Sequence, residues 1–482
     1  MLTLTLFPGF FVFSLVFYRA FIPDNKENTM QTALSPFYRR DLGDGLVLRW
    51  STAEDTERIA ALHSMVFREK AEEPPNSYMM GMIRRLMYGD HPFMGSHDFG
   101  VIEDTSKEGN PLVAATCLWK HTWTYEGIPF GVGRPEMVGT DPAYRNRGLV
   151  RALFAMVHER SEAEGDLVQA ITGIPYFYRQ FGYEYALELG DRCAIPIALI
   201  PKAKEGESEL CSLREATGED VPAIAALFRQ RSASSIVWES GPDKQWLYEI
   251  ETWKEHRELG HAFHFLMIID GSGQRVGFVA ADPIRWGKRL GVWLLEFAEG
   301  VNVQTAMPSV LRALHTYGLN LELARPDAPL LSEISFSVGT THPIHEVLSN
   351  ELAFAQEPPY AWYIRVKNLS AFLMHIAPAL EKRLATSPVV GHSGEIKLDF
   401  YRGGLRMVFE HGRLIVAEPW PVPLYDSHAS GGFPPLVFLQ LLFGHRSIEA
   451  LRHAFPDVWI SDEARPVLKA LFPTRPSFVC GW

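Results

Sequence analysis

The chain of 482 residues is too long for one hydrophobic core, so its length predicts about three domains. Its 47% hydrophobic and 21% charged residues are typical of a globular protein in water, and a net charge of −11 with no basic stripe argues against a nucleic-acid partner. The four cysteines form no CxxC pair, which indicates a reducing compartment, so we expect a cytoplasmic protein. The scattered histidines lack metal-binding spacing, and we expect no metal site.

The chain begins with eighteen uncharged residues, MLTLTLFPGFFVFSLVFY. They lack the basic start and the small-residue cleavage site of a signal peptide, and Pro8-Gly9 interrupts the apolar run. We therefore interpret residues 1–40 as an N-terminal extension. A membrane anchor within residues 1–29 stays open as the alternative.

Two segments of the chain repeat one another. LRWSTAEDTERIAAL at 48–62 and LREATGEDVPAIAAL at 213–227 share nine of fifteen positions without a gap. Each reads as a strand end, a Thr-x-Glu-Asp helix start and an apolar helix face. Such self-similarity predicts two copies of one domain, at 41–200 and 201–368, with the polar segment 201–209 as the boundary.

Strand-like and helix-like segments alternate within the first copy. Strands are predicted at 111–123, 129–140 and 167–173 from their alternating apolar residues. A helix is predicted from Gly148 to Gly165, with Leu149, Leu153, Met156 and Val157 on one face. The segment after it, with Pro175 near its start and Gly182 at its end, reads as a one-turn helix. The first copy is therefore predicted to be α/β or α+β.

The start of the long helix carries the strongest functional signal. Arg145, Arg147 and Arg151 surround Gly148 at a point where a helix normally prefers acidic residues. Glycine lets a ligand approach the backbone, the helix N–H groups point at it, and arginines suit phosphate oxygens. A pyrophosphate fits this pattern, whereas a P-loop or a dinucleotide fingerprint is absent. A solvated basic helix start is the structural alternative.

The second copy lacks these features. Its segment QTAMPSVLRAL aligns by Arg-Ala-Leu with the first copy and places Ser309 at the position of Gly148 and Pro308 at that of Arg147. One site per chain is therefore expected. From 369 on, a helix at 369–384, a strand meander at 394–418 and a helical end predict a third, α+β domain over 369–482.

The stretch RNRGLV at 145–150 resembles the pyrophosphate signature of GNAT acetyltransferases. RxRGLxR followed by Tyr-x-x-Phe-Gly-Tyr, matched at Tyr178 to Tyr183, resembles the enhanced intracellular survival (Eis-like) family in particular. That resemblance implies tandem GNAT-type domains, the second degenerate, a sterol-carrier-protein-like third domain, and a homo-oligomer, namely a hexamer. Val150 departs from the signature, where most of the superfamily has Gly or Ala.

The resemblance also implies a reaction and its residues. Acetyl-coenzyme A would donate the acetyl group to a primary amine, of an aminoglycoside-like polyamine or of lysine. Tyr178 matches the family's general acid, and the C-terminal carboxylate of Trp482 its base or amine-orienting group. An aromatic core role is the alternative for Tyr178, and a frayed tail for Trp482. The implied donor-binding residues are Val138, Gly139, Thr140, Arg145, Asn146, Arg147, Gly148, Leu149, Val150, Arg151, Gly173 and Ile174.

Two other functions remain open from the sequence. One is a non-catalytic protein that binds coenzyme A and, through its third domain, an apolar ligand. The other is a transferase that uses a different acyl donor on the same scaffold.

Overall fold

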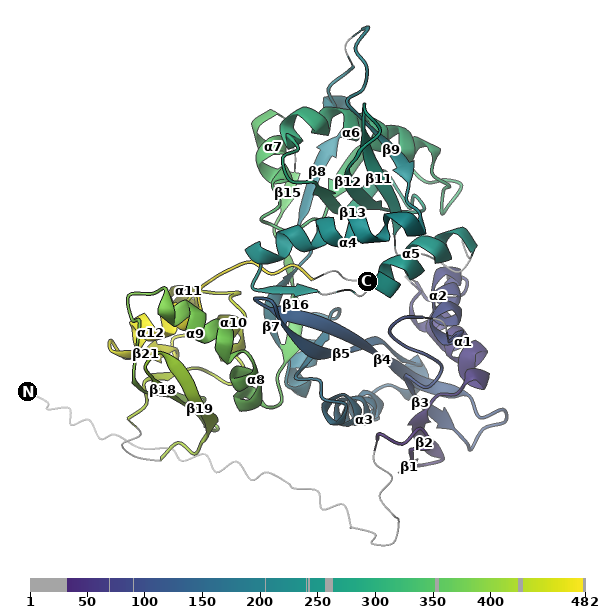
Figure 1. Cartoon of the computed structure of the whole chain (residues 1–482). Helices are drawn as coiled ribbons and strands as arrows, with labels where there is room; N and C mark the ends of the chain where they lie inside the picture. Colours follow the sequence, from purple (N-terminus) through teal and green to yellow (C-terminus); the bar gives the residue numbers. More distant parts are fainter. Residues whose placement is uncertain are drawn as a thin grey trace, which may run out of the picture.

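A computed structural model describes residues 33–68, 70–89, 91–203, 205–239, 241, 243–255, 263–351, 355–423 and 428–479. Most of the predicted N-terminal extension and Trp482 lie outside the described residues. The described strands form three sheets, each covered by helices, so the prediction of a mixed α/β fold is confirmed. Figure 1 shows the second sheet above the first, with the third to one side.

The first sheet has nine strands in the order β1-β2-β3-β4-β5-β6-β16-β7, with β10 paired to β4. Its strands are antiparallel except for the pair β5–β6. The long hairpin β4–β5 forms its centre, as the alternating apolar residues of these segments predicted. The strands are β1 (Arg39–Gly43), β2 (Leu46–Trp50), β3 (Phe99–Asp104), β4 (Leu112–Tyr125), β5 (Ile128–Thr140), β6 (Val168–Ile171), β7 (Glu184–Leu189), β10 (Val237–Glu239) and β16 (Tyr360–Arg365).

Helices cover both faces of this sheet. On one face, α3 (Leu149–Ala163) buries Leu149, Leu153, Met156 and Val157 against strand residues, as the helical periodicity predicted. On the other face, α1 (Thr56–Val66) and α2 (Ser77–Met87) pack onto the alternate residues of β3 and β4. Because strand side chains alternate between faces, the middle of the sheet is buried on both sides.

The second sheet has seven strands in the order β15-β8-β14-β13-β12-β11-β9. It packs against α4 (Val221–Gln230) and α5 (Asp243–Glu255) on one side, and against α6 (Val303–Asn320) and α7 (Ile344–Glu351) on the other. The strands are β8 (Arg192–Pro196), β9 (Cys211–Glu215), β11 (His264–Asp270), β12 (Arg275–Ala281), β13 (Arg289–Phe297), β14 (Glu333–Phe336) and β15 (Ala355–Glu357).

The first two sheets exchange strands, so sheet membership differs from the division drawn at 200/201 and 368/369. Strand β8, before residue 200, pairs with β14 and β15 in the second sheet. Strand β16, before residue 368, lies between β6 and β7 in the first sheet. Composition marks surface segments such as 201–209, whereas strand pairing depends on contacts between distant segments.

The third sheet has the order β19-β18-β17-β20-β21 and is the predicted meander with two short additions. The helix predicted over 369–384 is broken at Ile376 into two helices. The elements are β17 (Gly394–Asp399), β18 (Gly404–Glu410), β19 (Arg413–Trp420), β20 (Gly431–Gly432), β21 (Trp459–Ile460), α8 (Leu369–His375), α9 (Ala377–Ala385), α10 (Phe438–Leu442), α11 (Ile448–Ala454) and α12 (Ala464–Leu471).

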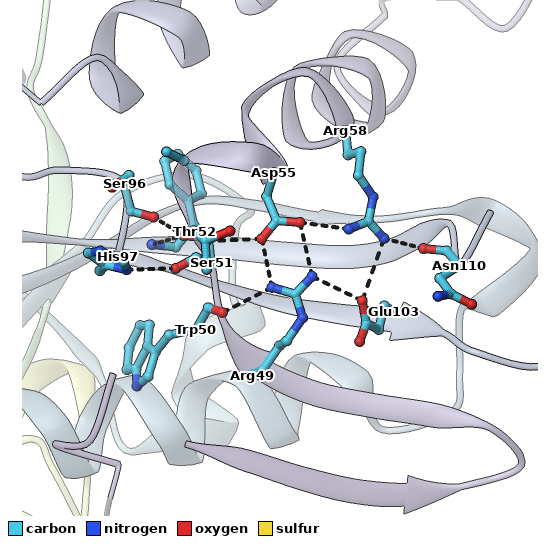
Figure 2. A network of polar contacts seen from close by, with 12 residues as sticks. Arg49, Trp50, Ser51, Thr52, Asp55, Arg58, Ser96, His97, Glu103 and Asn110 are labelled. Carbon is cyan, nitrogen blue, oxygen red and sulfur yellow. Dashed lines mark hydrogen bonds and ion pairs between the residues drawn. The ribbon is translucent and has the colours of Figure 1, made fainter. Parts of the chain in front are cut away.

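The two repeated segments have the same local structure. In each, an arginine at the end of a strand donates two hydrogen bonds to an aspartate at the following helix start: Arg49 to Asp55 at 2.6 and 2.9 Å, and Arg214 to Asp220 at 2.8 and 2.8 Å. In the first copy, Arg58 and Glu103 extend the network, as Figure 2 shows. The shared sequence therefore encodes one strand-to-helix corner, used twice.

In the second copy, the segment aligned with the arginine–glycine loop is helical. Ser309 lies inside α6, is buried, and donates its hydroxyl to the carbonyl of Ala306. A continuous helix offers no free N–H groups to an anion at this point. Short 3₁₀ helices connect other elements, at Ala53–Asp55, Pro142–Tyr144, Phe177–Phe181, Ile197–Leu199, Gly218–Asp220 and Arg231–Ser234. Within the described ranges, no helix is long and apolar enough to cross a membrane.

Candidate active site

The loop before α3 turns sharply at two residues with left-handed backbone. Asn146 has φ +65° and Gly148, the N-cap of α3, has φ +75°. A Cβ built on Gly148 meets no atom within 4 Å, so this backbone faces open space. Glycine and asparagine are the residues that adopt this conformation at least cost. The loop therefore presents the N–H groups at the start of α3 to a ligand.

The arginines lie on the surface of this loop. Arg145, Arg147 and Arg151 are all exposed. The guanidinium of Arg147 lies over the ring of Tyr144 at 5.0 Å, and that of Arg151 lies over Phe181 at 5.6 Å. Stacking on a ring orients these two guanidinium groups at the surface, where they can meet an incoming anion, and Arg151 Nη2 also donates to Gln180 Oε1 at 3.4 Å.

A cavity of about 580 Å³ opens beside the loop. Of the predicted donor-binding residues, Gly139, Arg147 and Gly173 do not contribute to its wall, and the others do. Gly139 is buried in β5, where its Cα faces Val66 and His63 of α1. Residues that the sequence did not indicate complete the wall, from the end of α1, the short helix Pro142–Tyr144 and the segment after β6: Val66, Phe67, Tyr144, Phe177, Gln180 and Phe181.

Strand β5 carries a bulge where it passes the cavity. Ala115 pairs with Gly139 and Cys117 with Glu136, so two residues of β5, Met137 and Val138, oppose one residue of β4. Met137 has φ +54°, and its carbonyl lies 2.7 Å from Nε2 of buried His63. Since a bulge removes a residue from the ladder, it frees backbone polar groups for a ligand. The sequence placed the donor at this strand end but did not predict the bulge.

Tyr178 lies in the short helix Phe177–Phe181 and is only 3% exposed. Its ring stacks on Phe154 at 5.7 Å and meets the edge of Tyr363, from β16, at 5.4 Å. The cluster that contains Tyr178 also includes Val138 and Val150, which line the donor-side cavity. Burial, together with the nearby carboxylate of Glu136, raises the pKa of Tyr178 above its usual value. Tyr178 is thus both an aromatic core residue and a neighbour of the candidate donor site.

A chain of buried polar contacts leads from Glu136 in β5 to Glu239 in β10. Arg134 Nη2 donates to Glu136 Oε1 at 3.0 Å, and Arg134 Nη1 lies 3.3 Å from His121 Nε2. His121 Nδ1 lies 2.7 Å from Glu239 Oε1 in β10. Burial, helped by Arg134, lowers the pKa of His121, so the ring is neutral, with Nδ1–H donating to Glu239. Burial also raises the pKa of Glu136, and Arg134 partly offsets this.

The end of the described chain returns from the third sheet to the space between the first two, as the tail in Figure 1 shows. Ile236 N–H donates to the Pro476 carbonyl at 2.9 Å, and Phe478 N–H to the Val237 carbonyl at 3.1 Å. The Phe478 ring lies 4.5 Å below the guanidinium of Arg231. The chain is therefore fixed beside β10 up to Phe478. Trp482, predicted to supply a carboxylate, lies outside the described residues.

This tail borders a second cavity, of about 500 Å³, between the first two sheets. Its wall comes mainly from α2, β4, α5, β13, the β12–β13 connection and the tail, with further residues from the segment around Phe93, from Leu189–Gly190, and from Phe263 and Ser337. The sequence did not predict it, because these segments are far apart in the chain and none carries a motif. Among the described residues, no group of three or more His, Cys, Asp or Glu side chains is arranged to hold a metal ion.

The fold and the loop are those expected of an acyl-transferring enzyme with a phosphate-bearing donor. Comparison with known proteins agrees. Residues 48–186 match the family model of the acetyltransferase (GNAT) domain. No curated protein matches the sequence.

Solved structures share the fold over most of the chain. A probable N-acyltransferase from Enterococcus faecalis V583 matches with a TM-score of 0.59 at 12% identity, over 90% of this chain and 97% of its own. A GCN5-related N-acetyltransferase from Kribbella flavida matches with 0.56 at 17% identity, over 90% and 97%. Eis1 from Mycobacterium abscessus matches with 0.54 at 14% identity, over 91% and 99%.

Residues 48–186 belong to the GNAT acetyltransferase domain family, and the protein is an acyltransferase. GNAT domains take acetyl-coenzyme A as acyl donor, and the open backbone at Gly148 with its three exposed arginines fits the donor's pyrophosphate. The match of residues 48–186 to the family model confirms the resemblance to GNAT acetyltransferases that RNRGLV at 145–150 carries.

Proposed function

We propose that the protein is an Eis-like N-acetyltransferase that moves the acetyl group of acetyl-coenzyme A to a primary amine. One observation carries this proposal: the Gly148 loop, the bulge of β5 and Tyr178 meet at a single cavity and the aromatic cluster beside it. These features supply, in one place, an anion site, free backbone groups for a thioester and a phenol for the leaving sulfur.

The donor is held by backbone and arginines in this proposal. The N–H groups at the start of α3, with Arg145, Arg147 and Arg151, bind the pyrophosphate. The thioester lies along Val138–Thr140, where a backbone N–H at the bulge polarises its carbonyl and stabilises the oxyanion formed by amine attack. The pantetheine arm passes Gly173–Ile174.

The chemistry is direct transfer. The amine nitrogen attacks the carbonyl carbon, the carbon–sulfur bond breaks, the thiolate leaves, and the new amide loses its extra proton. The raised pKa of Tyr178 keeps the phenol protonated at physiological pH, so its O–H is always available to the departing sulfur. Because a thiol is the stronger acid, we assign Tyr178 chiefly as a hydrogen-bond donor that stabilises the thiolate.

The second cavity is proposed to receive the acceptor. It shares β4 with the bulged hairpin through Trp119, and the tail borders it through Phe478 and Val479. The carboxylate of Trp482, three residues beyond Val479, is proposed to orient the amine or to accept its proton. The acceptor classes implied by the resemblance are aminoglycoside-like polyamines and lysine.

The wider organisation is also proposed by resemblance. The chain would comprise an extension (1–40), a catalytic GNAT domain (41–200), a degenerate copy (201–368) and a sterol-carrier-protein-like domain (369–482), assembled as a hexamer in the cytoplasm. The helical segment at Ser309 supports degeneracy of the second copy. Buried, unpaired Cys117, Cys193 and Cys211 are consistent with a reducing compartment. Light scattering of the purified protein tests the hexamer.

Steady-state release of coenzyme A thiol tests the function. Acetyl-coenzyme A is offered with spermine, kanamycin, lysine and a lysine peptide as acceptors. Saturable, amine-dependent release supports the proposal. Tight binding of acetyl-coenzyme A without release on any amine would favour a non-catalytic binding protein, and release only from another acyl donor would reassign the donor.

A further inference from the structure

The wall of the cavity between the first two sheets suits only some of the proposed acceptor classes. This inference rests on the proposed function. Much of its wall is aromatic, with the rings of Tyr78 and Trp286 edge to face at 6.0 Å. The other aromatic side chains are His91, Phe93, Trp119, Phe263, Trp293 and Phe478. A volume of about 500 Å³ is in the range of small-molecule sites. The wall thus suits a compact ligand with an apolar body.

The two carboxylates in the wall differ in their contacts. Glu249 Oε2 lies 3.6 Å from Arg85 Nη1, too far for a hydrogen bond, and has no hydrogen-bond partner among the described residues; both side chains are 5% exposed. Asp282 accepts hydrogen bonds from Gly291 N–H at 2.6 Å and Trp293 Nε1 at 2.7 Å. Burial raises the pKa of Glu249 and of Asp282, because a buried carboxyl group is less stable in its negatively charged form. With Asp282 already hydrogen-bonded, Glu249 Oε2 beside a buried arginine can accept from one ammonium group, and the wall makes a poor site for a ligand with several.

Arg85, a buried cation in the same wall, indicates that the ligand also carries a group that accepts hydrogen bonds. Its Nε and Nη1 have no hydrogen-bond partner among the described residues, and the same holds for Trp119 Nε1 and for both amide atoms of Gln245. Burial, with the charge of Arg85, lowers the pKa of His91 to about 3, so His91 stays neutral beside it. Buried donors without partners are costly unless a ligand satisfies them. Arg85 and Trp119 can only donate, so their missing partner is an oxygen acceptor, whereas Glu249 Oε2 and Gln245 Oε1 in the same wall lack a donor. A ligand that carries both an oxygen acceptor and an ammonium group answers both needs.

We propose that the acceptor is an amine that also carries a carboxylate or carbonyl group on a compact apolar body, as an amino acid or short peptide does, and that Arg85 binds this oxygen-bearing group. Of the acceptor classes raised by the sequence, this favours lysine and its peptides over polycations.

Matched acceptor pairs test the proposal. L-Phenylalanine is compared with phenethylamine, and 6-aminohexanoate with hexylamine, because each pair differs only in the carboxylate. We expect kcat/KM at least tenfold higher for one or both carboxylate members than for their partners, and higher than for spermine or kanamycin. Equal values within both pairs, or polycations as the best acceptors, would overturn the inference while leaving the acetyltransferase function intact.

A variant tests the assignment to Arg85. Arg85→Gln combined with Glu249→Gln removes both charges of the pair without leaving either one buried alone. The carboxylate preference should fall to near one in this double variant. The control is Arg192→Gln combined with Glu333→Gln, a cross-strand pair at 2.8 Å in the second sheet, which should keep the preference. A preference that survives in the Arg85 double variant would contradict the assignment.

A binding measurement separates the two proposals. Calorimetry with 3-phenylpropanoate, which has the carboxylate and ring but no amine, reports on the cavity without turnover. We expect binding to the wild-type protein and at least tenfold weaker binding to the Arg85 double variant. Binding with no thiol release from any amine would retain the cavity assignment and reject the acetyltransferase. Turnover of amines without any binding of 3-phenylpropanoate would retain the acetyltransferase and reject the cavity assignment.

Discussion

His121 and Glu239 share a buried hydrogen bond of 2.7 Å between Nδ1 and Oε1. His121 lies in β4 of the β4–β5 hairpin, and Glu239 lies in β10, which follows the start of the second repeated segment and pairs with β4. Strand β10 also holds the returning tail through the Val237 carbonyl. One short strand therefore contacts the first sheet, the core of the second sheet through Trp238, and the tail.

Glu239→Gln should destabilise the protein, because the neutral amide weakens a charge-assisted bond to a buried ring. We expect a loss of about 1–3 kcal/mol, seen as a lower thermal midpoint. Glu410→Gln, at an exposed position, serves as the control and should leave the midpoint unchanged. An unchanged midpoint for Glu239→Gln would show that the bond contributes little.

Gly148→Leu should raise the KM for acetyl-coenzyme A at least tenfold, because the side chain would occupy the open space that faces the donor. Gly165→Leu is a matched control, since Gly165 ends the same helix, also has positive φ (+94°), and also has no atom within 4 Å of a built Cβ. Both variants carry the same kind of backbone strain, and only the first should affect the donor. A change within threefold at Gly148, about 0.65 kcal/mol, would mean that the loop does not bind the donor.

Tyr178→Phe should lower kcat at least tenfold with every amine and leave donor binding nearly unchanged, since only the hydroxyl is removed. Tyr183→Phe is the control: its hydroxyl lies 2.7 Å from His158 Nε2 in the same aromatic cluster, and its loss should affect stability more than kcat. The raised pKa of Tyr178 further predicts that its ionisation causes no loss of kcat up to about pH 10. Equal kcat for Tyr178→Phe and wild type would assign Tyr178 to packing alone.

Residues appended after Trp482 should depress kcat while acetyl-coenzyme A binding stays intact. The tail is fixed beside β10 up to Phe478, so an added segment alters the groups at the acceptor cavity and not those at the loop. The same residues appended at the N-terminus provide the control. Full turnover by the C-terminally extended enzyme would remove the terminal carboxylate from the mechanism.

The hydrogen bonds that Asp220 makes in the second strand-to-helix corner should contribute to the free energy of unfolding in a pH-dependent way. Hydrogen bonds from Arg214 lower the pKa of Asp220 from 3.8 to about 2. A depressed pKa adds stability that is fully present above about pH 3.8 and is lost as the pH falls through about 2, here about 2 kcal/mol. Asp220→Asn should therefore lower the thermal midpoint clearly at pH 7 and less at pH 3, whereas Asp44→Asn, at an exposed turn, should lower it at neither. A deficit of equal size at both pH values would contradict the linkage.

The sequence predicted those features that a few adjacent residues encode. Arg49, Thr52 and Asp55 recur as Arg214, Thr217 and Asp220, and each set builds its own strand-to-helix corner from local hydrogen bonds. Gly148 likewise marks the loop by itself, because its backbone conformation is a local property.

The rest depends on contacts between distant segments. Tyr363 reaches Tyr178 only because β16 inserts beside β6, and Arg85 meets Glu249 only because α2 and α5 come together across the first two sheets. Neither pairing leaves a periodic pattern or motif in the chain, and both are set by how the sheets pack. The bulge at Met137 could not be predicted from the sequence either, because it is defined by the register between β5 and β4.

The cleft beside the Gly148 loop and the β5 bulge, with Tyr178 buried in the aromatic cluster behind its wall, is proposed to transfer acetyl groups to amines. The most direct test of this proposal is a single-turnover reaction of enzyme-bound acetyl-coenzyme A with a primary amine, followed by mass spectrometry of the amine. We predict one acetylated amine per coenzyme A thiol released, at a rate that Tyr178→Phe and Gly148→Leu both reduce. Thiol release without an acetylated amine, or full rates in both variants, would contradict the account.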